Sequence, residues 1–319
     1  MRLELLNIPL QGVNDAITKQ FGVHLFVLRL DLVHPEISGN KVFKLKYNLL
    51  EAEKAGAKTL LTFGGAFSNH IAATAAAGKK YDFKTIGIIR GEEHSELNPT
   101  LKFATDCGMK LEYVSRTFYQ NKKELYEFAS KQFEKEKIYF IPEGGSNALG
   151  VLGCQEITKF IAIDFDYVCC ACGTGATMAG VIKSVKNNQK AIGFQVLKAD
   201  GYIKKEVSNW LTDSIGEQES AIQNQEKYSV QNNWSINEEY HFGGYAKINE
   251  ELIEFIKQFE QNNTIPLDYV YTGKMMFGVY DLISKGFFKS GKTVIAIHTG
   301  GLQGNLGFKF RDNKLTNNG

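Results

Sequence analysis

The chain alternates between strand-like and helix-like segments along almost its whole length. Short apolar runs rich in β-branched and aromatic residues predict nine strands, at Phe26–Leu32, Lys58–Phe63, Lys84–Ile89, Lys110–Val114, Lys137–Ile141, Asp166–Ala171, Ala191–Leu197, Asp268–Tyr271 and Thr293–Ile297. Between them, apolar residues at helical spacing predict helices, for example at Lys41–Ala55, Asn69–Lys79, Asn121–Glu136, Thr177–Asn187 and Asn249–Gln261. This rhythm is typical of an α/β fold with open, mostly parallel twisted sheets covered by helices.

The strand–helix units fall into two series. Four units lie between Ala57 and Gly145, and a second series starts at Asp166. We therefore expect a large domain made of residues 1–47 and 152–319, a smaller inserted α/β domain at 48–151, and an active site in the cleft between them. The polar stretch Thr212–Asn233 is the least regular part, and it predicts a helix followed by a surface excursion.

Composition excludes several classes of protein. The 319 residues carry a formal net charge of +2, which gives no indication of a nucleic-acid or anionic-membrane partner. No run of 18 or more apolar residues occurs, so we expect no transmembrane helix. The start, Met1–Asn7, lacks the apolar stretch and cleavage site of a secretory signal, so we expect a cytoplasmic protein.

Three of the five cysteines lie in the apolar, strand-like stretch Tyr167–Cys172. Cys169 and Cys172 have the C-x-x-C spacing of a metal site, but residues three apart on a strand point to opposite faces. No second pair of cysteine or histidine ligands complements them. We therefore expect small buried core residues and no metal.

Lys41 follows Ser38-Gly39-Asn40 at the start of a predicted helix. The positive end of the helix dipole opposes a charged lysine there and lowers its basicity. A neutral lysine amine can react with a carbonyl group, so Lys41 is a candidate nucleophile, although the position also suits an ordinary surface lysine. Its neighbours Lys44 and Lys46 are expected to be solvated or to contact a phosphate.

Two glycine-rich loops follow predicted strands and open helices. In Gly64–His70, Ser68 or Asn69 can cap the helix, and the free N–H groups behind it can bind a carboxylate; a plain capped turn is the other interpretation. In Gly173–Thr177, glycines admit an anion close to the backbone, and threonines add hydroxyl donors. The second loop matches neither a Walker loop nor a dinucleotide fingerprint, so a single phosphate group suits it better.

Further polar groups are predicted at the same edge. Tyr271-Thr272 and Thr299 end the last two predicted strands, and Tyr245 lies in another glycine-rich loop. Ligands of open α/β sheets bind outside the carboxyl ends of the strands. Each residue alone fits a packing role, whereas their shared position favours a binding site.

Taken together, these segments resemble the family of 1-aminocyclopropane-1-carboxylate deaminases and D-cysteine desulfhydrases, which are pyridoxal-phosphate enzymes of fold type II. The resemblance runs from Leu28 to Gly301 and is most specific at Gly39-Asn40-Lys41, with Lys44-Leu45 and Ser68-Asn69. It implies that pyridoxal 5'-phosphate is the cofactor and that Lys41 carries it covalently. The implied contacts are Asn69 with the cofactor's 3-oxygen, Ser68 with the substrate carboxylate, and Gly173, Thr174, Gly175, Ala176 and Thr177 with the phosphate; Tyr245 and Tyr271 would face the substrate.

Two positions distinguish members within this family. The deaminase pattern has an acid directly after the tyrosine that matches Tyr271 and leucine before the final Gly-Gly, whereas the desulfhydrase pattern has threonine at both, as Thr272 and Thr299 are here. An acid near the pyridine nitrogen makes the ring a stronger electron sink, which ring opening needs and sulfide release does not. A threonine hydroxyl can hydrogen-bond a neutral pyridine nitrogen instead. His70 follows Ser-Asn where deaminases tend to carry glutamine, which also favours the desulfhydrase pattern. Ser68, Asn69 and His70 are the candidates for substrate binding.

The expected function is therefore a pyridoxal-phosphate-dependent lyase acting on a small amino acid, with D-cysteine as leading substrate and pyruvate, ammonia and sulfide as products. The alternatives are an aminocyclopropanecarboxylate deaminase, another β-eliminase or racemase, and a ligand-binding protein on the same scaffold without turnover. The resemblance also leads us to expect a homodimer.

Overall fold

The computed structural model describes residues 6–212 and 233–308. Its strands are β1 Leu10–Val13, β2 His24–Arg29, β3 Thr59–Gly65, β4 Lys84–Arg90, β5 Met109–Val114, β6 Ile138–Ile141, β7 Tyr167–Cys172, β8 Lys190–Gln195, β9 Trp234–Asn237 and β10 Thr293–His298. Its α-helices are α1 Ala16–Phe21, α2 Asn40–Lys54, α3 Asn69–Tyr81, α4 Pro99–Asp106, α5 Arg116–Gln120, α6 Lys122–Gln132, α7 Ala148–Cys154, α8 Ala176–Ser184, α9 Tyr202–Thr212, α10 Glu250–Asn263 and α11 Thr272–Ser284. Four short 3-10 turns complete the described part: η1 Leu30–Leu32, η2 Glu143–Gly145, η3 Ile157–Phe160 and η4 Glu239–His241.

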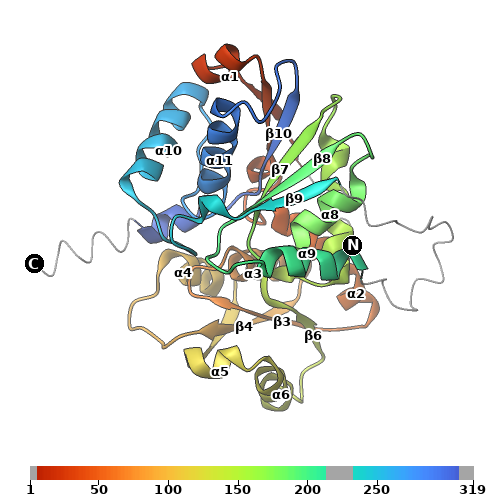
Figure 1. The fold of residues 1–319 in the computed structure, drawn as a ribbon. Coiled ribbons are helices and arrows are strands. Elements are labelled where there is room, and N and C mark those ends of the chain that lie inside the picture. Colours follow the sequence, from red (N-terminus) through yellow and green to blue (C-terminus); the bar gives the residue numbers. More distant parts are fainter. Residues whose placement is uncertain (1–5, 213–232, 309–319) are drawn as a thin grey trace, which may run out of the picture.

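The strands form two sheets, drawn one above the other in Figure 1. The larger sheet has the order β1-β2-β10-β7-β8-β9, and only the β1–β2 pair is antiparallel. The smaller sheet has the order β5-β4-β3-β6 and is parallel throughout. The expectation of an α/β fold with two mostly parallel sheets is confirmed.

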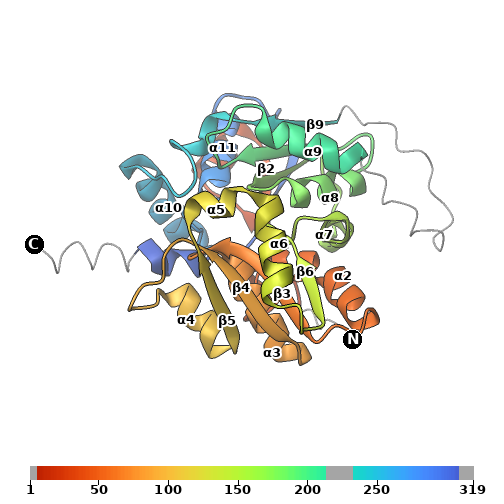
Figure 2. The ribbon, with the colours of Figure 1, turned by 90° about the horizontal axis from the view of Figure 1, so that it is seen from below.

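Helices cover both faces of each sheet. On the larger sheet, α10 and α11 pack against the face that holds Cys169, whereas α8 and α9 pack against the face that holds Cys170. On the smaller sheet, α5 and α6 cover one face and α3 and α4 the other, as Figure 2 shows from below. One apolar cluster reaches from the larger sheet through α2 and α3 to β3, so the two sheets share a core.

One predicted strand is wrong. Asp268–Tyr271 forms a turn that leads into α11, because the Asp268 carboxylate accepts hydrogen bonds from the backbone N–H groups of Val270, Tyr271 and Thr272. An aspartate that binds the next backbone N–H groups favours a turn or helix start over a strand. Apolar composition alone did not reveal this competition.

Two short strands escaped sequence analysis. Both β1 and β9 have four residues, too few to display a period-two pattern, and each lies at an edge of the larger sheet. The predicted surface excursion within Thr212–Asn233 falls at residues 213–232, which lie outside the described residues. No helix within 6–212 or 233–308 has the length and apolar character that crossing a bilayer requires.

Candidate active site

The start of α2 is fixed by close backbone packing against the end of β10. Gly39 has a φ of +67°, and a Cβ atom there would overlap the carbonyl oxygen of Thr299. The Asn40 backbone N–H donates to that same oxygen at 3.1 Å, and the Asn40 side chain donates to Thr177 Oγ1 at 2.9 Å. Only glycine fits the first position, and Asn40 then ties the helix to both β10 and α8. Lys41, the next residue, is thereby held where the start of α2 meets the end of β10 and the start of α8.

Lys41 is a low-pKa amine. Burial, and then the neighbouring charge of Lys44, hold the pKa of Lys41 well below its ordinary value. Its Nζ lies 3.5 Å from the carbonyl oxygen of Gly144, in the η2 turn after β6. The sequence predicted this lowering from the helix dipole, and the structure adds burial as the leading cause. A neutral amine at this position can attack a carbonyl carbon.

Lys44 supplies a buried cation one helical turn further along α2. Its side chain is 2% exposed, and Nζ lies 3.1 Å from Gly144 O, 3.2 Å from Ser146 Oγ and 3.3 Å from Thr174 Oγ1. Burial lowers the pKa of Lys44, and none of these three oxygens belongs to a carboxylate. A buried lysine without an acidic partner is costly, and an anionic ligand would complete its coordination.

The start of α8 has the geometry of an anion site. Gly175 precedes the helix with a φ of +79°, and no side chain caps the helix, whereas Ser68 caps α3 and Asn249 caps α10. The first backbone N–H groups of an α-helix have no partner within the helix, and they attract anions. The Lys44 ammonium lies beside Thr174 at this same turn. These residues therefore fit a single phosphate group.

Not every predicted phosphate contact is free. Thr177 Oγ1 accepts a hydrogen bond from Asn40, and Thr174 Oγ1 shares a hydrogen bond of 2.6 Å with Ser146 Oγ. The Thr177 hydroxyl therefore links the start of α8 to the start of α2, and the Thr174 hydroxyl lies beside Ser146 and the Lys44 ammonium. Lys44 and Lys46 were both expected to be solvated or to contact a phosphate, but they differ. Lys46 pairs with Glu156 at 2.6 Å, whereas Lys44 lies beside Thr174.

Ser68 caps α3. Its Oγ accepts hydrogen bonds from the backbone N–H groups of His70 at 3.2 Å and Ile71 at 3.3 Å. The capping interpretation is therefore confirmed, and the hydroxyl hydrogen of Ser68 stays available to another acceptor. The adjacent Asn69 accepts from Gln303 through Oδ1, and a Cβ on Gly301 would lie 3.0 Å from Asn69 Nδ2. This helix start therefore faces the loop that follows β10.

The His70 ring does not lie on the outer side of this helix start. It is 1% exposed, and its Nε2 is 2.8 Å from Thr62 Oγ1 on β3. Because Thr62 donates its own hydrogen to Ile141 O, His70 Nε2 is the donor in this pair. Burial and the charges of Lys41 and Lys44 hold the pKa of His70 well below its ordinary value. The ring is therefore neutral, and it connects the start of α3 to β3 through its hydrogen bond with Thr62.

Tyr271 lies beside the Gly173–Thr177 loop, and Tyr245 packs against Tyr271. The rings of Tyr271 and Tyr245 meet edge to face with centroids 6.1 Å apart. A Cβ on Gly173 would lie 3.1 Å from Tyr271 Cε1, so the lack of a side chain at Gly173 leaves room for the Tyr271 ring. Burial, and the neighbouring Tyr245, raise the pKa of Tyr271 well above its ordinary value. Tyr271 is therefore a phenol that keeps its proton and can donate it.

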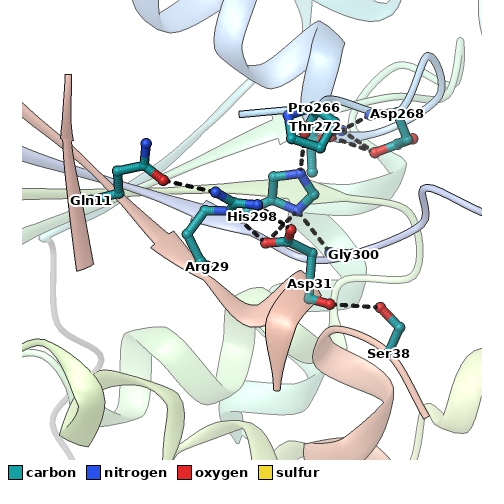
Figure 3. Close-up of polar contacts among 9 residues, drawn as sticks. All are labelled: Gln11, Arg29, Asp31, Ser38, Pro266, Asp268, Thr272, His298 and Gly300. Atoms are coloured by element: carbon teal, nitrogen blue, oxygen red, sulfur yellow. Dashed lines mark hydrogen bonds and ion pairs between the residues drawn. The ribbon is translucent and has the colours of Figure 1, made fainter. Parts of the chain in front are cut away.

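Thr272 is bound to Asp268 through both of its hydrogen-bonding functions (Figure 3). Its hydroxyl donates to Asp268 Oδ2 at 2.5 Å and accepts from the Asp268 backbone N–H at 2.9 Å. Both residues are buried, at 1% exposure for Asp268 and 0% for Thr272. A hydroxyl has one hydrogen, so this arrangement leaves none to donate to a neutral pyridine nitrogen. The predicted role of Thr272 as such a donor is therefore corrected to that of an acceptor at most.

A buried ion pair supports the loops on the β2 and β10 side (Figure 3). Arg29 binds Asp31 through two hydrogen bonds of 2.9 and 2.7 Å, and Asp31 Oδ1 lies 3.5 Å from His298 Nδ1. His298 Nδ1 also accepts a hydrogen bond from the backbone N–H of Gly300, and the Ser38 hydroxyl donates one to the backbone carbonyl oxygen of Asp31. The network therefore joins the loop before Lys41 to the loop after β10.

Comparisons with known proteins agree with this geometry. The model of the family described as "Pyridoxal-phosphate dependent enzyme" matches residues 6–300, and the chain belongs to this family. A protein of Thermotoga maritima, provisionally assigned as a 1-aminocyclopropane-1-carboxylate deaminase, is 34% identical over 95% of this chain and 96% of its own. The mitochondrial bifunctional D-cysteine desulfhydrase/1-aminocyclopropane-1-carboxylate deaminase of Arabidopsis thaliana is 30% identical over 89% of this chain and 73% of its own.

A solved structure matches the fold equally broadly. The crystal structure of an ACC deaminase homologue superposes with a TM-score of 0.81 at 27% identity, covering 97% of this chain and 94% of that one. Pyridoxal phosphate is therefore the cofactor of this enzyme family, and the uncapped α8 start with Lys44 fits its phosphate. When bound, the cofactor withdraws electrons from the bonds at the substrate's Cα.

Proposed function

We propose that this protein is a lyase that uses pyridoxal phosphate to convert D-cysteine and water into pyruvate, ammonia and sulfide. The observation that carries the choice of reaction is the hydrogen bond of 2.5 Å between Thr272 and Asp268. A carboxylate in place of Thr272 would meet the Asp268 carboxylate in a fully buried site, and two such charges repel each other. The deaminase pattern, with its acid after the tyrosine, is therefore disfavoured in this chain.

Lys41 and Tyr271 are proposed to have different roles in proton transfer, because their pKa values are shifted in opposite directions. We infer that Lys41 carries the cofactor, and that its Nζ accepts the Cα proton after the substrate's amino group has displaced it. The lowered pKa of Lys41 leaves this released amine neutral. Tyr271, whose pKa is raised, is proposed as a proton donor near the leaving group. Tyr245 supports the Tyr271 ring from the side. This assignment leaves His70 with a supporting role, because its ring is bound to Thr62.

The substrate carboxylate is proposed to bind at the start of α3. Ser68 keeps its hydroxyl hydrogen free, and Asn69 presents its amide beside Gly301. Helix starts favour anions, so a carboxylate there gains from both the hydroxyl and the helix dipole. Asn69 is proposed to contact the cofactor's 3-oxygen as well, and Thr299 to line the opposite side.

One substrate panel tests the proposal. Purified protein with cofactor is assayed on D-cysteine, L-cysteine and aminocyclopropanecarboxylate, with sulfide, ammonia and keto acid measured together. We expect sulfide release from D-cysteine to exceed ring opening at least tenfold, which corresponds to about 1.4 kcal/mol of transition-state stabilisation. Faster ring opening would favour the second candidate, the deaminase, which the bifunctional plant relative supports. Cofactor binding without turnover of any substrate would instead indicate a binding protein.

The remaining organisation is also a proposal. All four strands of the smaller sheet lie within the inserted domain expected at 48–151, and α2 packs against α7 where the chain crosses between the two parts. A homodimer is proposed from the family resemblance, and the expected cytoplasmic location also stays a proposal. Light scattering of the purified protein tests the first, and cell fractionation tests the second.

A further inference from the structure

Lys274 is a buried lysine that the proposed reaction leaves without a role. It lies in the first turn of α11, three residues after Tyr271, and it is 0% exposed. Its Nζ donates to two neutral carbonyl oxygens, those of His241 at 2.9 Å and Gly244 at 2.7 Å. A buried ammonium that binds only carbonyl groups costs stability, and an apolar side chain of similar length would avoid that cost.

The two carbonyl groups belong to the loop that carries Tyr245. His241 O also accepts from the backbone N–H of Gly244 at 3.0 Å, and Gly244 O accepts from that of Lys247 at 3.1 Å. Each carbonyl oxygen thus uses both of its acceptor sites, one within the loop and one on Lys274. The loop folds around the Lys274 ammonium, and Tyr245 follows the second of these carbonyls.

The loop has an unfavourable backbone of its own. Phe242, Gly243, Gly244 and Ala246 have φ values of +52°, +89°, +120° and +55°. Non-glycine residues in this region cost on the order of 1 kcal/mol or more each, so the conformation needs support from outside. Tyr245 as a residue is 45% exposed, so packing fixes it only in part. Phe242 provides one anchor against Phe277, and Lys274 provides the polar one.

We propose that Lys274 is a positioning residue: its ammonium holds the His241–Gly244 turn so that Tyr245 stands against Tyr271. Both tyrosines depend on the first turn of α11, which supplies Tyr271 directly and holds Tyr245 through Lys274. The kinetic part of this proposal rests on the proposed function, because it assumes that the tyrosine pair serves the lyase reaction.

Hydrogen exchange tests the anchor without reference to activity. In Lys274→Met, we expect the amides of Gly244 and Lys247 to exchange at least tenfold faster, while amides in the middle of α11 keep their protection. Lys274→Gln, which retains an N–H donor, should recover part of the protection. The matched control is Lys247→Met, an exposed lysine of the same loop. Unchanged exchange at both amides in Lys274→Met and Lys274→Gln would overturn the proposal.

A double-mutant cycle tests the link to the reaction. Lys274→Met should lower kcat by roughly tenfold while cofactor absorbance is retained, and it should add little further loss in a Tyr245→Phe background, because both changes then remove the same interaction. Fully additive losses would overturn the link to Tyr245. Wild-type protein that turns over no amino acid of the panel would refute the proposed function, and the exchange experiment would still decide on the anchor.

Discussion

The ammonium of Lys44 lies 3.3 Å from Thr174 Oγ1, although 130 positions separate the two residues in the sequence. This contact joins the helix that carries Lys41 to the turn before α8. Burial is the main cause of the lowered pKa of Lys41, and the nearby Lys44 charge lowers that pKa further. The proposed phosphate site and the proposed cofactor lysine therefore share one buried neighbour, Lys44.

The turn at Gly175 gives the first prediction. Gly175→Val forces a branched residue to a φ of +79° and brings its Cβ to about 3.1 Å from Val207 Cγ2. We expect cofactor affinity to fall at least tenfold, or about 1.4 kcal/mol, in a titration followed by absorbance. Gly108→Ala is the control, because Gly108 also has a positive φ but nothing within 4 Å. Equal affinity in the Gly175 variant and wild type would contradict the phosphate assignment.

The Ser68 hydroxyl gives the second prediction. Ser68→Ala removes a helix cap, which should cost about 1 kcal/mol of unfolding free energy, and it should also reduce turnover while cofactor absorbance stays unchanged. Asn249→Ala removes the cap of α10 in the same way. Comparing kcat/KM of the two variants separates the roles, since only the Ser68 change should impair turnover. Normal turnover in Ser68→Ala would limit the residue to capping.

The Asp268–Thr272 contact gives the third prediction. Thr272→Glu replaces a hydrogen bond by two adjacent buried carboxylates, so we expect the free energy of unfolding to fall by about 2 kcal/mol or more. Adding Asp268→Asn should recover part of this loss, with Asp268→Asn alone as the reference. Thermal unfolding of the four proteins measures the effect. A Thr272→Glu variant as stable as wild type would remove the argument against a carboxylate at this position.

Lys274 gives a pH-dependent prediction. Burial lowers the pKa of Lys274 to about 8 from an ordinary value of 10.5, and the charge of Asp268 only partly opposes this. Between these two pH values the unfolded chain binds a proton that the folded chain does not, so stability rises with pH. The unfolding free energy of wild type relative to Lys274→Met should therefore increase from pH 8 to pH 10.5. Denaturant titrations across this range measure the difference in unfolding free energy. A difference that stays constant or falls would show that folding does not lower the pKa of Lys274.

Sequence patterns predicted the elements better than the contacts between them. Eight of the nine expected strands and the loops that follow them were found, because long apolar runs and glycine-rich turns are local signals. The role of Asp268 was missed, since its carboxylate accepts from the backbone N–H groups of Val270, Tyr271 and Thr272 and turns an apolar run into a helix start. The glycine at the start of a helix, as at Gly175, is a local signal that predicted the turn before α8.

One sequence alone did not predict which side chains that are distant in the chain contact each other. The burial of Lys44 and Lys274 depends on residues about 30 to 130 positions away, and no local pattern distinguishes either from a solvated lysine. His70 was expected at the substrate for its place after Ser68-Asn69, but the helix turns its ring toward β3. Side-chain direction at a helix start depends on the packing beneath it.

The central claim is that Lys41 carries the cofactor, and labelling tests it most directly. Protein loaded with pyridoxal phosphate is reduced with borohydride and digested, and the modified peptide is identified by mass spectrometry. We expect the label on Lys41, and we expect Lys41→Ala to lose both the label and the visible absorbance while the fold survives. A label on Lys44 or Lys274 in the wild-type protein would contradict the account.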